Sequence, residues 1–249
     1  MNRTSIRRRL ATSDHWAPRK LRALHKGLHS FSIPTPRIVV GPMLKGYLAA
    51  RTAYFEALRI FWCEPLLKAY CKSYGREVHT TAHVPWIVGR GALALGDHVT
   101  FSGKVSIYFA ARYADEPLLK IGDHTGLSNG CRIVVGRAVV IGNHVRIGQN
   151  VTIRDSNGHA SDPAARKRGD PPSEDEVRPV TIEDNVWIGA DVAIGPGITI
   201  GEGSIVSAKS VVLSSVPPYS IMSGFPARKI GTLTREDAAP RSPSDPENP

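Results

Sequence analysis

The sequence predicts an all-β repeat protein, and three observations carry this prediction. Branched apolar residues occupy every sixth position over one stretch, at Ile182, Ile188, Ile194, Ile200, Val206 and Val212. A helix repeats its buried face roughly every 3.6 residues and a strand every second residue, so a period of six requires a coil with a short strand and a corner in each unit. Glycine follows three of these residues, at Gly189, Gly195 and Gly201, which predicts tight corners where φ is positive.

The third observation is that the same period extends upstream. Four thirteen-residue segments align without gaps, with an aliphatic residue or Phe at the first, seventh and thirteenth places; they begin at Leu95, Ile121, Ile141 and Ile182. This array resembles the hexapeptide-repeat acyltransferases, whose units wind a left-handed parallel β-helix with three units per turn. The resemblance extends over roughly residues 87 to 231. It implies the handedness and the number of units per turn, neither of which follows from the spacing.

Composition suits this fold class. The chain of 249 residues is long enough to bury a sizeable core, and its 23 Gly and 19 Pro are typical of a turn-rich coil. The three cysteines, Cys63, Cys71 and Cys131, cannot all pair and lack a CxxC spacing, which indicates a reduced, cytoplasmic location. No signal peptide is predicted, and charged residues interrupt the most apolar stretch, residues 44–63, so no membrane span is predicted.

The net charge of +10 belongs to the N-terminal part of the chain. Residues 1–80 contain 15 Lys and Arg but 4 Asp and Glu, whereas the remainder contains 17 and 18. The repeat domain is therefore close to neutral. We expect residues 1–40 to be basic and loosely ordered. No nucleic-acid-binding module accompanies the charge, so a nucleic acid is not predicted as a partner.

A helical segment is predicted for residues 41–80. Apolar residues recur at spacings that place them near one helix face: Leu44, Leu48, Phe55, Leu58 and Trp62. Pro65 then starts a second short helix that reaches about Tyr74. Repeat arrays need capping, so we expect this segment to cover the open first turn of the coil. The alternative is that the aromatic and basic N-terminus rests on an anionic membrane surface near a lipid-linked substrate.

The repeat domain, residues 81–232, contains three interruptions. Two are small: the register is delayed by two residues before Ile121 and by two more before Ile141. The third is a polar and Pro-rich excursion loop over residues 154–179. Long insertions in compact domains tend to be functional or disordered, so this loop is the first place to look for chemistry. Residues 233–249 are rich in Pro, Ser and acidic residues, which predicts a disordered tail.

The excursion loop contains Asn157-Gly158-His159, which resembles the segment that holds the catalytic histidine of galactoside, maltose and related sugar acetyltransferases. The resemblance implies that His159 is the general base. A hydroxyl group is a poor nucleophile at neutral pH, and an imidazole can take its proton as it attacks a thioester carbonyl. Asp155 is the candidate to hold the other ring nitrogen, with Asp162 as its competitor. The alternative is a solvated histidine among ordinary loop charges.

The sequence of the last repeat units predicts a cofactor-binding site. Their closing sequence, SIVSAKSVVLSSVPPYSIMSGFPARKIG, resembles the closing segment of the family, which typically ends VPPxSxxxGxPAR and binds acetyl-coenzyme A along the coil edge. The resemblance implies that Ala190 and Ala208 offer backbone groups to the pantetheine arm. It also implies that Arg228 meets the nucleotide phosphates and that Trp187 lies beside the thioester channel. Ordinary coil packing is the alternative role for these residues.

The closing segment departs from the family at one point. The family often has Thr-Lys where this chain has Leu213 and Ser214, so one phosphate contact is in doubt. Ser214 stays in the predicted cofactor site, and Lys209 is the substitute for the missing cation. On the acceptor side, the sugar-binding positions of the family fall on Ser128 and Gly136, with Asn129 adjacent. Ser128 and Asn129 are the predicted acceptor-binding residues, although the match does not identify the acceptor.

Three histidines recur at one place in three units, at His98, His124 and His144. Their separations are not multiples of eighteen, so nothing requires them to stack, and we interpret them as exposed corner residues rather than metal ligands. This argues against γ-class carbonic anhydrases, whose H-x4-H pair the array lacks. Cys131 occupies a place held by Val in other units and is predicted to be a core residue, not a nucleophile.

Together these features predict a coenzyme A-dependent O-acetyltransferase that acts on a hydroxyl of a sugar, a polysaccharide precursor or a glycolipid, with acetyl-CoA as donor and no metal. Members of the family are usually homotrimers with the active site between neighbouring coils. The resemblance therefore implies that His159 acts on a thioester bound partly by the next subunit. Serine acetyltransferase is the alternative enzyme, because SVVLSSVPP is similar to its ending, although its long helical N-terminal domain has no match. A non-catalytic coil that serves as an assembly scaffold is the alternative outside enzymes.

Overall fold

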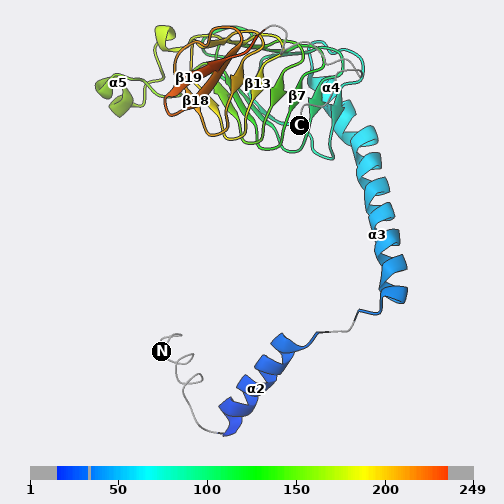
Figure 1. The fold of residues 1–249 in the computed structure, drawn as a ribbon. Coiled ribbons are helices and arrows are strands. Elements are labelled where there is room, and N and C mark those ends of the chain that lie inside the picture. The colour runs from blue at the N-terminus through cyan, green and yellow to red at the C-terminus, as the bar shows by residue number, and fades with distance from the viewer. Residues whose placement is uncertain (1–15, 33–34, 235–249) are drawn as a thin grey trace. The chain divides into compact units, whose positions relative to one another are not determined.

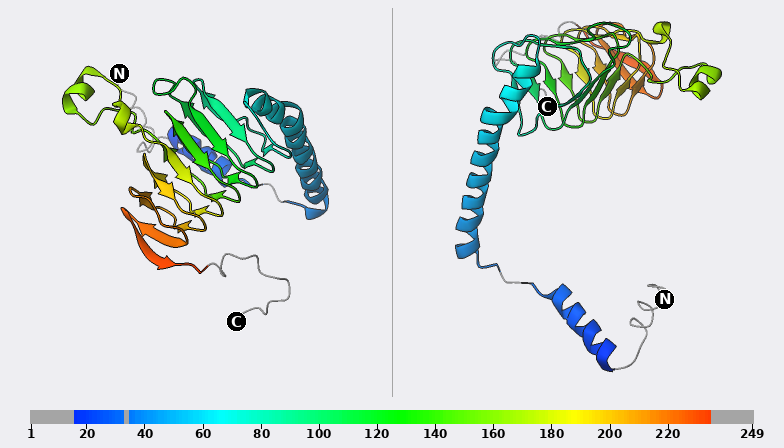
Figure 2. Two further views of the ribbon diagram at one scale, coloured as in Figure 1. Left: turned by 90° about the horizontal axis from the view of Figure 1, so that it is seen from above. Right: turned by 180° about the vertical axis from the view of Figure 1, so that it is seen from behind.

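The structure is a computed structural model that describes residues 16–32 and 35–234. The chain divides into two compact units, residues 1–51 and residues 52–249. The predicted tail lies outside the described residues from residue 235 onward. Figures 1 and 2 show the stacked turns of the coil in the second unit and the loop with helix α5 projecting from it.

The described part of the first unit is helical. Helix α2 is Trp16–Ser30, and helix α3 is Arg37–Leu58, whose last turns belong to the second unit. Within residues 1–40, which are predicted to be loosely ordered, α2 is helical and its apolar residues recur at helical spacing; residues 1–15 lie outside the described residues. Among the described helices, none is long and apolar enough to cross a membrane.

The second unit is a coil of short parallel strands that stack into three sheets. The eight-stranded sheet contains β1 (His79–Thr80), β4 (Thr100–Phe101), β7 (Gly126–Leu127), β10 (Arg146–Ile147), β13 (Trp187–Ile188), β16 (Ile205–Val206), β18 (Ser220–Gly224) and β19 (Ala227–Thr232). The six-stranded sheet contains β2 (Trp86–Val88), β5 (Ser106–Phe109), β8 (Arg132–Val135), β11 (Thr152–Arg154), β14 (Ala193–Ile194) and β17 (Val211–Val212). The five-stranded sheet contains β3 (Ala92–Leu95), β6 (Leu118–Ile121), β9 (Ala138–Ile141), β12 (Val180–Ile182) and β15 (Thr199–Ile200). Among the strands of the described residues, β18 and β19 alone pair antiparallel, at the end of the coil.

Each turn of the coil passes through the three sheets in the same order, and its three corners are named here by that order. The first corner joins the five-stranded to the eight-stranded sheet, the second joins the eight-stranded to the six-stranded sheet, and the third joins the six-stranded sheet to the next turn. The predicted aliphatic series pairs across turns: Ile121 lies opposite Leu95 and Ile141, and Ile141 opposite Ile182. These side chains are buried inside the coil, so the prediction of an all-β repeat is confirmed.

The corner glycines are needed for a different reason from the one predicted. Gly189, Gly195 and Gly201 are not among the residues with positive φ. Gly189 is required because a Cβ atom there would lie 2.5 Å from the backbone nitrogen of Ala208 in the next turn, and a Cβ at Gly201 would clash with Pro218. Gly195 has no such contact. Close approach of successive turns, rather than φ, therefore explains two of the three glycines.

Positive φ occurs instead in a column along the first corner, which includes His98, His124 and His144. Their rings stack, with centroid separations of 4.5 Å between His98 and His124 and 4.8 Å between His124 and His144. The spacing of these histidines in the sequence did not predict that they stack, because it includes the inserted residues between them. The rings lie parallel and do not converge, and no group of metal-binding side chains is found among the described residues.

The segment predicted as a helical cap, residues 41–80, contains three consecutive helical elements in the structure. The end of α3 continues as the π-helix η1 (Arg59–Cys63) and then α4 (Glu64–Tyr70), which is four residues shorter than predicted. Cys63 and Leu67 are buried, so this short segment does cover the start of the coil. By contrast, α3 buries no residue, and Phe55 and Trp62 are exposed, as are Leu44 and Leu48. Within the second unit, Cys63 and Leu67 are thus the residues of this segment that pack on the coil, and a capping role for the rest of residues 41–80 stays a prediction.

A buried carboxylate ties this cap to the first strand. Glu64 is buried, accepts a hydrogen bond from the Arg59 guanidinium at 2.5 Å, and lies 3.0 Å from the Nδ1 atom of His79 in β1. Burial raises the pKa of Glu64, but the hydrogen bonds with His79 and Arg59 outweigh it and lower the pKa below its ordinary value. The cap is thus held by Leu67 packing and by one ionised carboxylate.

Cys131 behaves as the sequence predicts, as a core residue. It is buried at the second corner, and burial raises the pKa of its thiol to about 11. Because only the thiolate reacts, iodoacetamide at about pH 8 should leave Cys131 unmodified in the folded protein and label it after unfolding in guanidinium. Mass spectrometry of the Cys131 peptide checks this, with Cys131→Ala as the control. Rapid labelling of the folded chain would contradict the core assignment.

Candidate functional site

All three interruptions of the repeat lie at the third corner. They are residues 110–117 between β5 and β6, residues 136–137 between β8 and β9, and the excursion loop, residues 155–179, between β11 and β12. Strand pairing on both sides is continuous through the insertions, because β5, β8 and β11 pair in register and so do β6, β9 and β12. The inserted residues are thus collected in one place without disturbing the coil.

Side chains from the two shorter insertions hold the excursion loop. Tyr113 donates a hydrogen bond from its hydroxyl to the backbone oxygen of Pro172 at 3.0 Å. Arg137 donates to the backbone oxygen of Glu174 at 3.3 Å and pairs with its carboxylate at 3.2 Å. Both contacts join residues that the sequence separates widely. The third corner is therefore a platform on which the loop rests.

Asp155 is the central anchor of this platform. It is fully buried at the start of the loop, and its carboxylate accepts hydrogen bonds from the backbone N–H groups of Gly136 at 2.7 Å, Arg137 at 2.6 Å and Ala138 at 3.0 Å. Burial raises the pKa of Asp155, and these N–H groups oppose the rise. The sequence suggested that Asp155 holds the ring of His159. Both of its oxygens accept from backbone N–H groups, which makes Asp155 an anchor of the corner, and its role in orienting His159 stays a prediction.

The loop also has internal supports. Glu176 accepts hydrogen bonds from the backbone N–H of Ser161 at 2.8 Å and from Ser173 at 2.8 Å, and hydrogen bonds with these two serines lower its pKa to about 2. Asp162, the competitor for orienting His159, accepts from the backbone N–H of Ala165 and caps helix α5 (Pro163–Arg168). Helix α5 and the single 3₁₀ turn η2 (Glu174–Glu176) make the loop ordered rather than disordered.

His159 is exposed on this supported loop. Its neighbours on both sides are fixed: Ser156 and Ala160 are buried, and the backbone oxygen of Ala160 accepts a hydrogen bond from Arg166 at 3.0 Å. Within the described part of the chain, no side chain forms a hydrogen bond with the imidazole. The arrangement therefore presents an accessible ring from a restrained backbone.

The predicted donor and acceptor residues gather at the second corner. The same place in four successive turns is held by Asn129, Gln149, Ala190 and Ala208, and Ser128 and Lys209 flank this column. Ala208 and Lys209 are exposed. The Asn129 side chain is already used, since its Oδ1 accepts from the backbone N–H of Lys104 at 2.9 Å. The backbone oxygen of Ala190 accepts a hydrogen bond from the backbone N–H of Lys209 at 2.8 Å, so this oxygen is already used within the coil.

The remaining predicted cofactor residues lie elsewhere. Trp187 is on β13 of the eight-stranded sheet, where its side chain is 57% exposed. Arg228 is exposed on β19, and neither it nor Lys209 forms an ion pair with a described residue. Ser214 is exposed at the third corner, two turns beyond Asp155. Arg228 and Lys209 are thus cations without an ion-pair partner among the described residues, which suits them to an anionic group.

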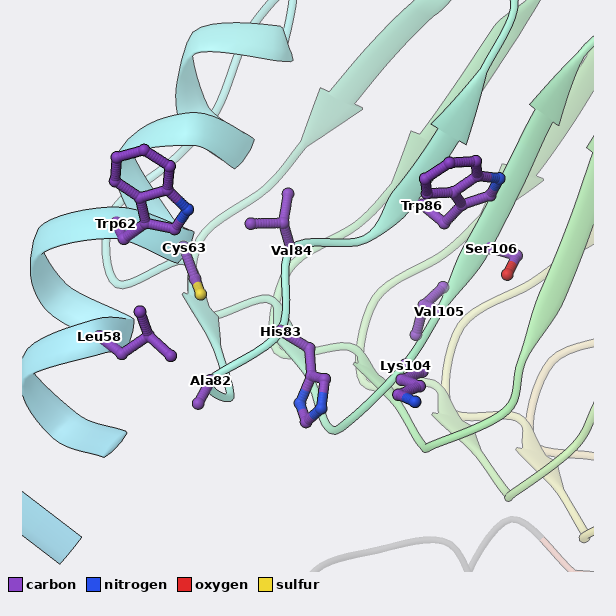
Figure 3. Close-up of a pocket in the computed structure, with 10 residues that line it drawn as sticks. All are labelled: Leu58, Trp62, Cys63, Ala82, His83, Val84, Trp86, Lys104, Val105 and Ser106. Atoms are coloured by element: carbon purple, nitrogen blue, oxygen red, sulfur yellow. The ribbon is translucent and has the colours of Figure 1, made fainter. Parts of the chain in front are cut away.

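In a single chain the predicted site is divided. His159 and Ser214 lie at the third corner, whereas Ala190, Ala208 and Lys209 lie at the second, with the six-stranded sheet between them. A hollow of about 470 Å³ lies instead at the start of the coil, and Figure 3 shows Trp62 of η1 and Trp86 of β2 on either side of Val84. No predicted site residue lines that hollow.

Sequence reasoning missed Tyr113 and Arg137, which position the loop but match no catalytic motif. One signal was available: both lie where the repeat register slips. Gly136, which the sequence placed on the acceptor side, belongs to this platform as well. A Cβ atom at Gly136 would lie 2.8 Å from Val177, so this position fits only glycine.

Comparisons with known proteins agree with this geometry. Residues 179–214 match the family described as bacterial transferase hexapeptide (six repeats). Serine acetyltransferase of Escherichia coli (strain K12) is 33% identical over 168 residues, which are 67% of this chain and 53% of that protein. The chain thus spans about half the length of this curated relative.

Two solved structures share the fold. AntD, an N-acyltransferase from Bacillus cereus, is 22% identical with a TM-score of 0.57, over 70% of this chain and 90% of that one. A hexapeptide-repeat-containing acetyltransferase from Vibrio cholerae O1 biovar eltor, complexed with acetyl-coenzyme A, is 26% identical with a TM-score of 0.50, over 72% of this chain and 82% of that one. The repeat domain of this chain is therefore similar to the hexapeptide-repeat transferases, and it folds as a left-handed parallel β-helix.

Proposed function

We propose that this protein is an acyltransferase that moves an acetyl group from acetyl-coenzyme A to a hydroxyl acceptor, with His159 as general base. The observation that carries the proposal is the platform at the third corner, where Asp155, Tyr113 and Arg137 hold the loop that presents His159. The Vibrio cholerae structure with acetyl-coenzyme A and the serine acetyltransferase relative both support the reaction class.

The proposed reaction needs no covalent enzyme intermediate. The acceptor oxygen attacks the thioester carbonyl while His159 removes the hydroxyl proton. The C–S bond breaks, the coenzyme A thiolate leaves and takes a proton from the imidazolium, and the acetyl ester is released. His159 therefore ends in the form in which it began. The general base must be able to reach the acceptor hydroxyl. His159 suits this role because its ring is exposed, while the buried residues Ala160 and Ser156 restrain the backbone on either side of it.

We infer that the site forms between subunits of a homotrimer. In one chain His159 is at the third corner and the residues assigned to the donor, Ala190, Ala208 and Lys209, are at the second. A threefold assembly of coils brings the third corner of one subunit to the second corner of its neighbour. In this arrangement His159 of one subunit meets the donor-binding residues of the next, and no corner has to change its conformation. This explains why the two parts of the site lie apart in a single chain.

Arg228 is assigned to the nucleotide phosphates, so Arg228→Ala should raise the KM for acetyl-coenzyme A about 10-fold, the usual size of a lost charge-assisted contact. The reaction rate at saturating donor should change little, because this contact is made equally before and during transfer. Lys229→Ala is the matched control, since adjacent residues of a strand face opposite sides. An unchanged KM would remove Arg228 from the donor site.

Two acceptor classes follow from different observations. The Asn157-Gly158-His159 segment resembles that of sugar acetyltransferases and favours a hydroxyl on a sugar, a polysaccharide precursor or a glycolipid. The curated relative named serine acetyltransferase favours the hydroxyl of serine. Within the part of the chain that the structure describes, no segment decides between them. The prediction of a cytoplasmic location stays a prediction.

The deciding experiment measures thiol release from acetyl-coenzyme A with a panel of sugars, glycolipids and amino acids. Release that depends on a carbohydrate supports the first acceptor class, and release that depends on serine supports the second. Thiol release with none of these acceptors, or no release at all, would overturn the proposed acyl transfer to a hydroxyl. The second result would favour the assembly scaffold, which keeps the coil and its trimer but performs no chemistry.

A further inference from the structure

We propose that residues 16–51 bind the surface of an anionic lipid bilayer and hold the coil at a membrane. This inference goes beyond the proposed reaction and does not depend on it. It rests on three features of the first unit: the charge of its sequence, the amphipathic character of α2, and the uncovered apolar residues of α3.

The whole net charge of the chain is in the first unit. Residues 1–51 contain 11 Lys and Arg and one acidic residue, Asp14. The remaining residues contain 21 basic and 21 acidic side chains, so residues 52–249 are neutral at +0 and residues 1–51 account for all of the +10. A charge density of this kind attracts an anionic surface, with each Lys or Arg near the surface strengthening binding roughly 5-fold.

Helix α2 separates charge from apolar residues in its second half, from Leu24 to Leu28, whereas Lys20, four residues before Leu24, shares the side of the leucines. Leu24 and Leu28 are four residues apart, so they lie on one side of the helix, and their side chains are 62% and 68% exposed. Lys26 lies between them in sequence and therefore on the opposite side, and the helix contains no acidic residue. A basic amphipathic helix of this kind lies in the plane of a membrane interface with its apolar side in the acyl region.

Helix α3 continues the uncovered apolar surface. It contains no buried residue, and Ile38 and Met43 are 90% and 67% exposed. Lys45 is the only charged residue between Ile38 and Ala50. Soluble monomers rarely expose apolar side chains in such a cluster, and a helix that is apolar on several sides is normally covered.

The combination of positive charge and exposed apolar residues favours an anionic lipid surface over a second copy of the chain or a nucleic acid as the binding partner. A second copy of residues 16–51 would cover the leucines but would bring two sets of seven positive charges together. A nucleic acid would neutralise the charge but would leave Leu24, Leu28 and Ile38 in water. An anionic bilayer satisfies both, because its headgroups take the basic side chains and its acyl chains take the apolar ones.

The test is co-sedimentation of the full chain with vesicles of phosphatidylcholine alone and vesicles in which part of it is replaced by phosphatidylglycerol. We expect binding to the anionic vesicles only, and its loss when salt rises from about 0.1 M to about 1 M, where the Debye length falls to roughly 3 Å. The double variants Leu24→Glu with Leu28→Glu, and Lys20→Glu with Lys26→Glu, should each weaken partitioning at least about 10-fold.

Matched controls carry the same changes in the second unit. Leu66→Glu alters an exposed leucine of α4, and Lys120→Glu with Lys167→Glu reverses two charges on the coil and its loop; both should bind vesicles like the parent. Equal binding of all variants, or equal binding of the parent to neutral vesicles, overturns the proposal. If the leucine variant instead lowers the mass of the protein in solution and no vesicle is bound, a second copy covers this face and the lipid assignment is wrong.

Discussion

Replacing His159 with alanine is expected to lower the rate of acyl transfer by about 10² to 10⁴ while the coil stays folded, because a positioned general base contributes a factor of this size. His159 is exposed and no described side chain forms a hydrogen bond with its ring, so its removal breaks no contact that holds the loop. His159→Gln should lose nearly as much, since an amide can hydrogen-bond to the acceptor hydroxyl but cannot accept its proton.

The matched control is His144→Ala, which removes another exposed imidazole from the first corner. It should keep the parental rate of coenzyme A release. Both variants should retain the melting temperature and the assembly state of the parent within error. Parental activity in His159→Ala would exclude this residue as the base. Lost activity together with a lower melting temperature in His159→Gln would indicate a structural role instead.

The coil could be predicted from the sequence because its core is a strict pattern. Every sixth residue from Ile182 to Val212 points inward, and the pairing of Ile182 with Ile200 and of Ile194 with Val212 shows that three units make one turn. The sequence alone gave the period but not the number of units per turn, since no residue records which strands will pair. That number came from the resemblance to a family.

The histidine column shows where counting along the sequence fails. His98, His124 and His144 are 26 and 20 residues apart, and a turn of three six-residue units would separate stacked residues by eighteen. They nevertheless stack, because the extra residues between them lie at the third corner and leave the strands in register. Insertions of this kind lengthen a corner without rotating the coil, so a column is preserved even when its spacing in sequence is not.

The contacts of Asp155 and of helix α3 could not be predicted from any local pattern in the sequence. A carboxylate four residues before a histidine suggests a hydrogen bond to its ring, yet Asp155 is buried and accepts from backbone N–H groups one turn away. Helical spacing along α3 likewise tells only which residues share a side, not what covers them. Both depend on contacts distant in sequence.

The platform at the third corner could have been predicted by comparing the three interruptions of the repeat register. Each delay of the register marks extra residues, and in a regular coil these must leave at a corner. The sequence did not show that the three slips fall on the same corner, where Tyr113 and Arg137 reach the excursion loop. Once the order of the sheets is known, the position of His159 follows from the insertion that carries it.

Asp155→Ala is expected to lower the free energy of unfolding by about 3 kcal/mol, because three backbone N–H groups lose their acceptor inside a buried corner and each unsatisfied group costs roughly 1–3 kcal/mol. Asp155→Asn should cost about 2 kcal/mol, since one amide oxygen remains but the amide nitrogen then faces backbone donors. Urea denaturation measures both, and amide hydrogen exchange at Gly136 and Ala138 should quicken.

These variants also separate the two roles of Asp155. If it anchors the third corner, activity and stability fall together, and the control Asp162→Asn, which alters only the cap of the exposed helix α5, costs about 1 kcal/mol or less. If Asp155 instead orients His159 in the assembled enzyme, Asp155→Asn should abolish transfer while the unfolding free energy and the hydrogen exchange stay parental. The short hydrogen bonds from Gly136 and Arg137 favour the first outcome, because a carboxylate that satisfies three backbone groups has little capacity left for an imidazole.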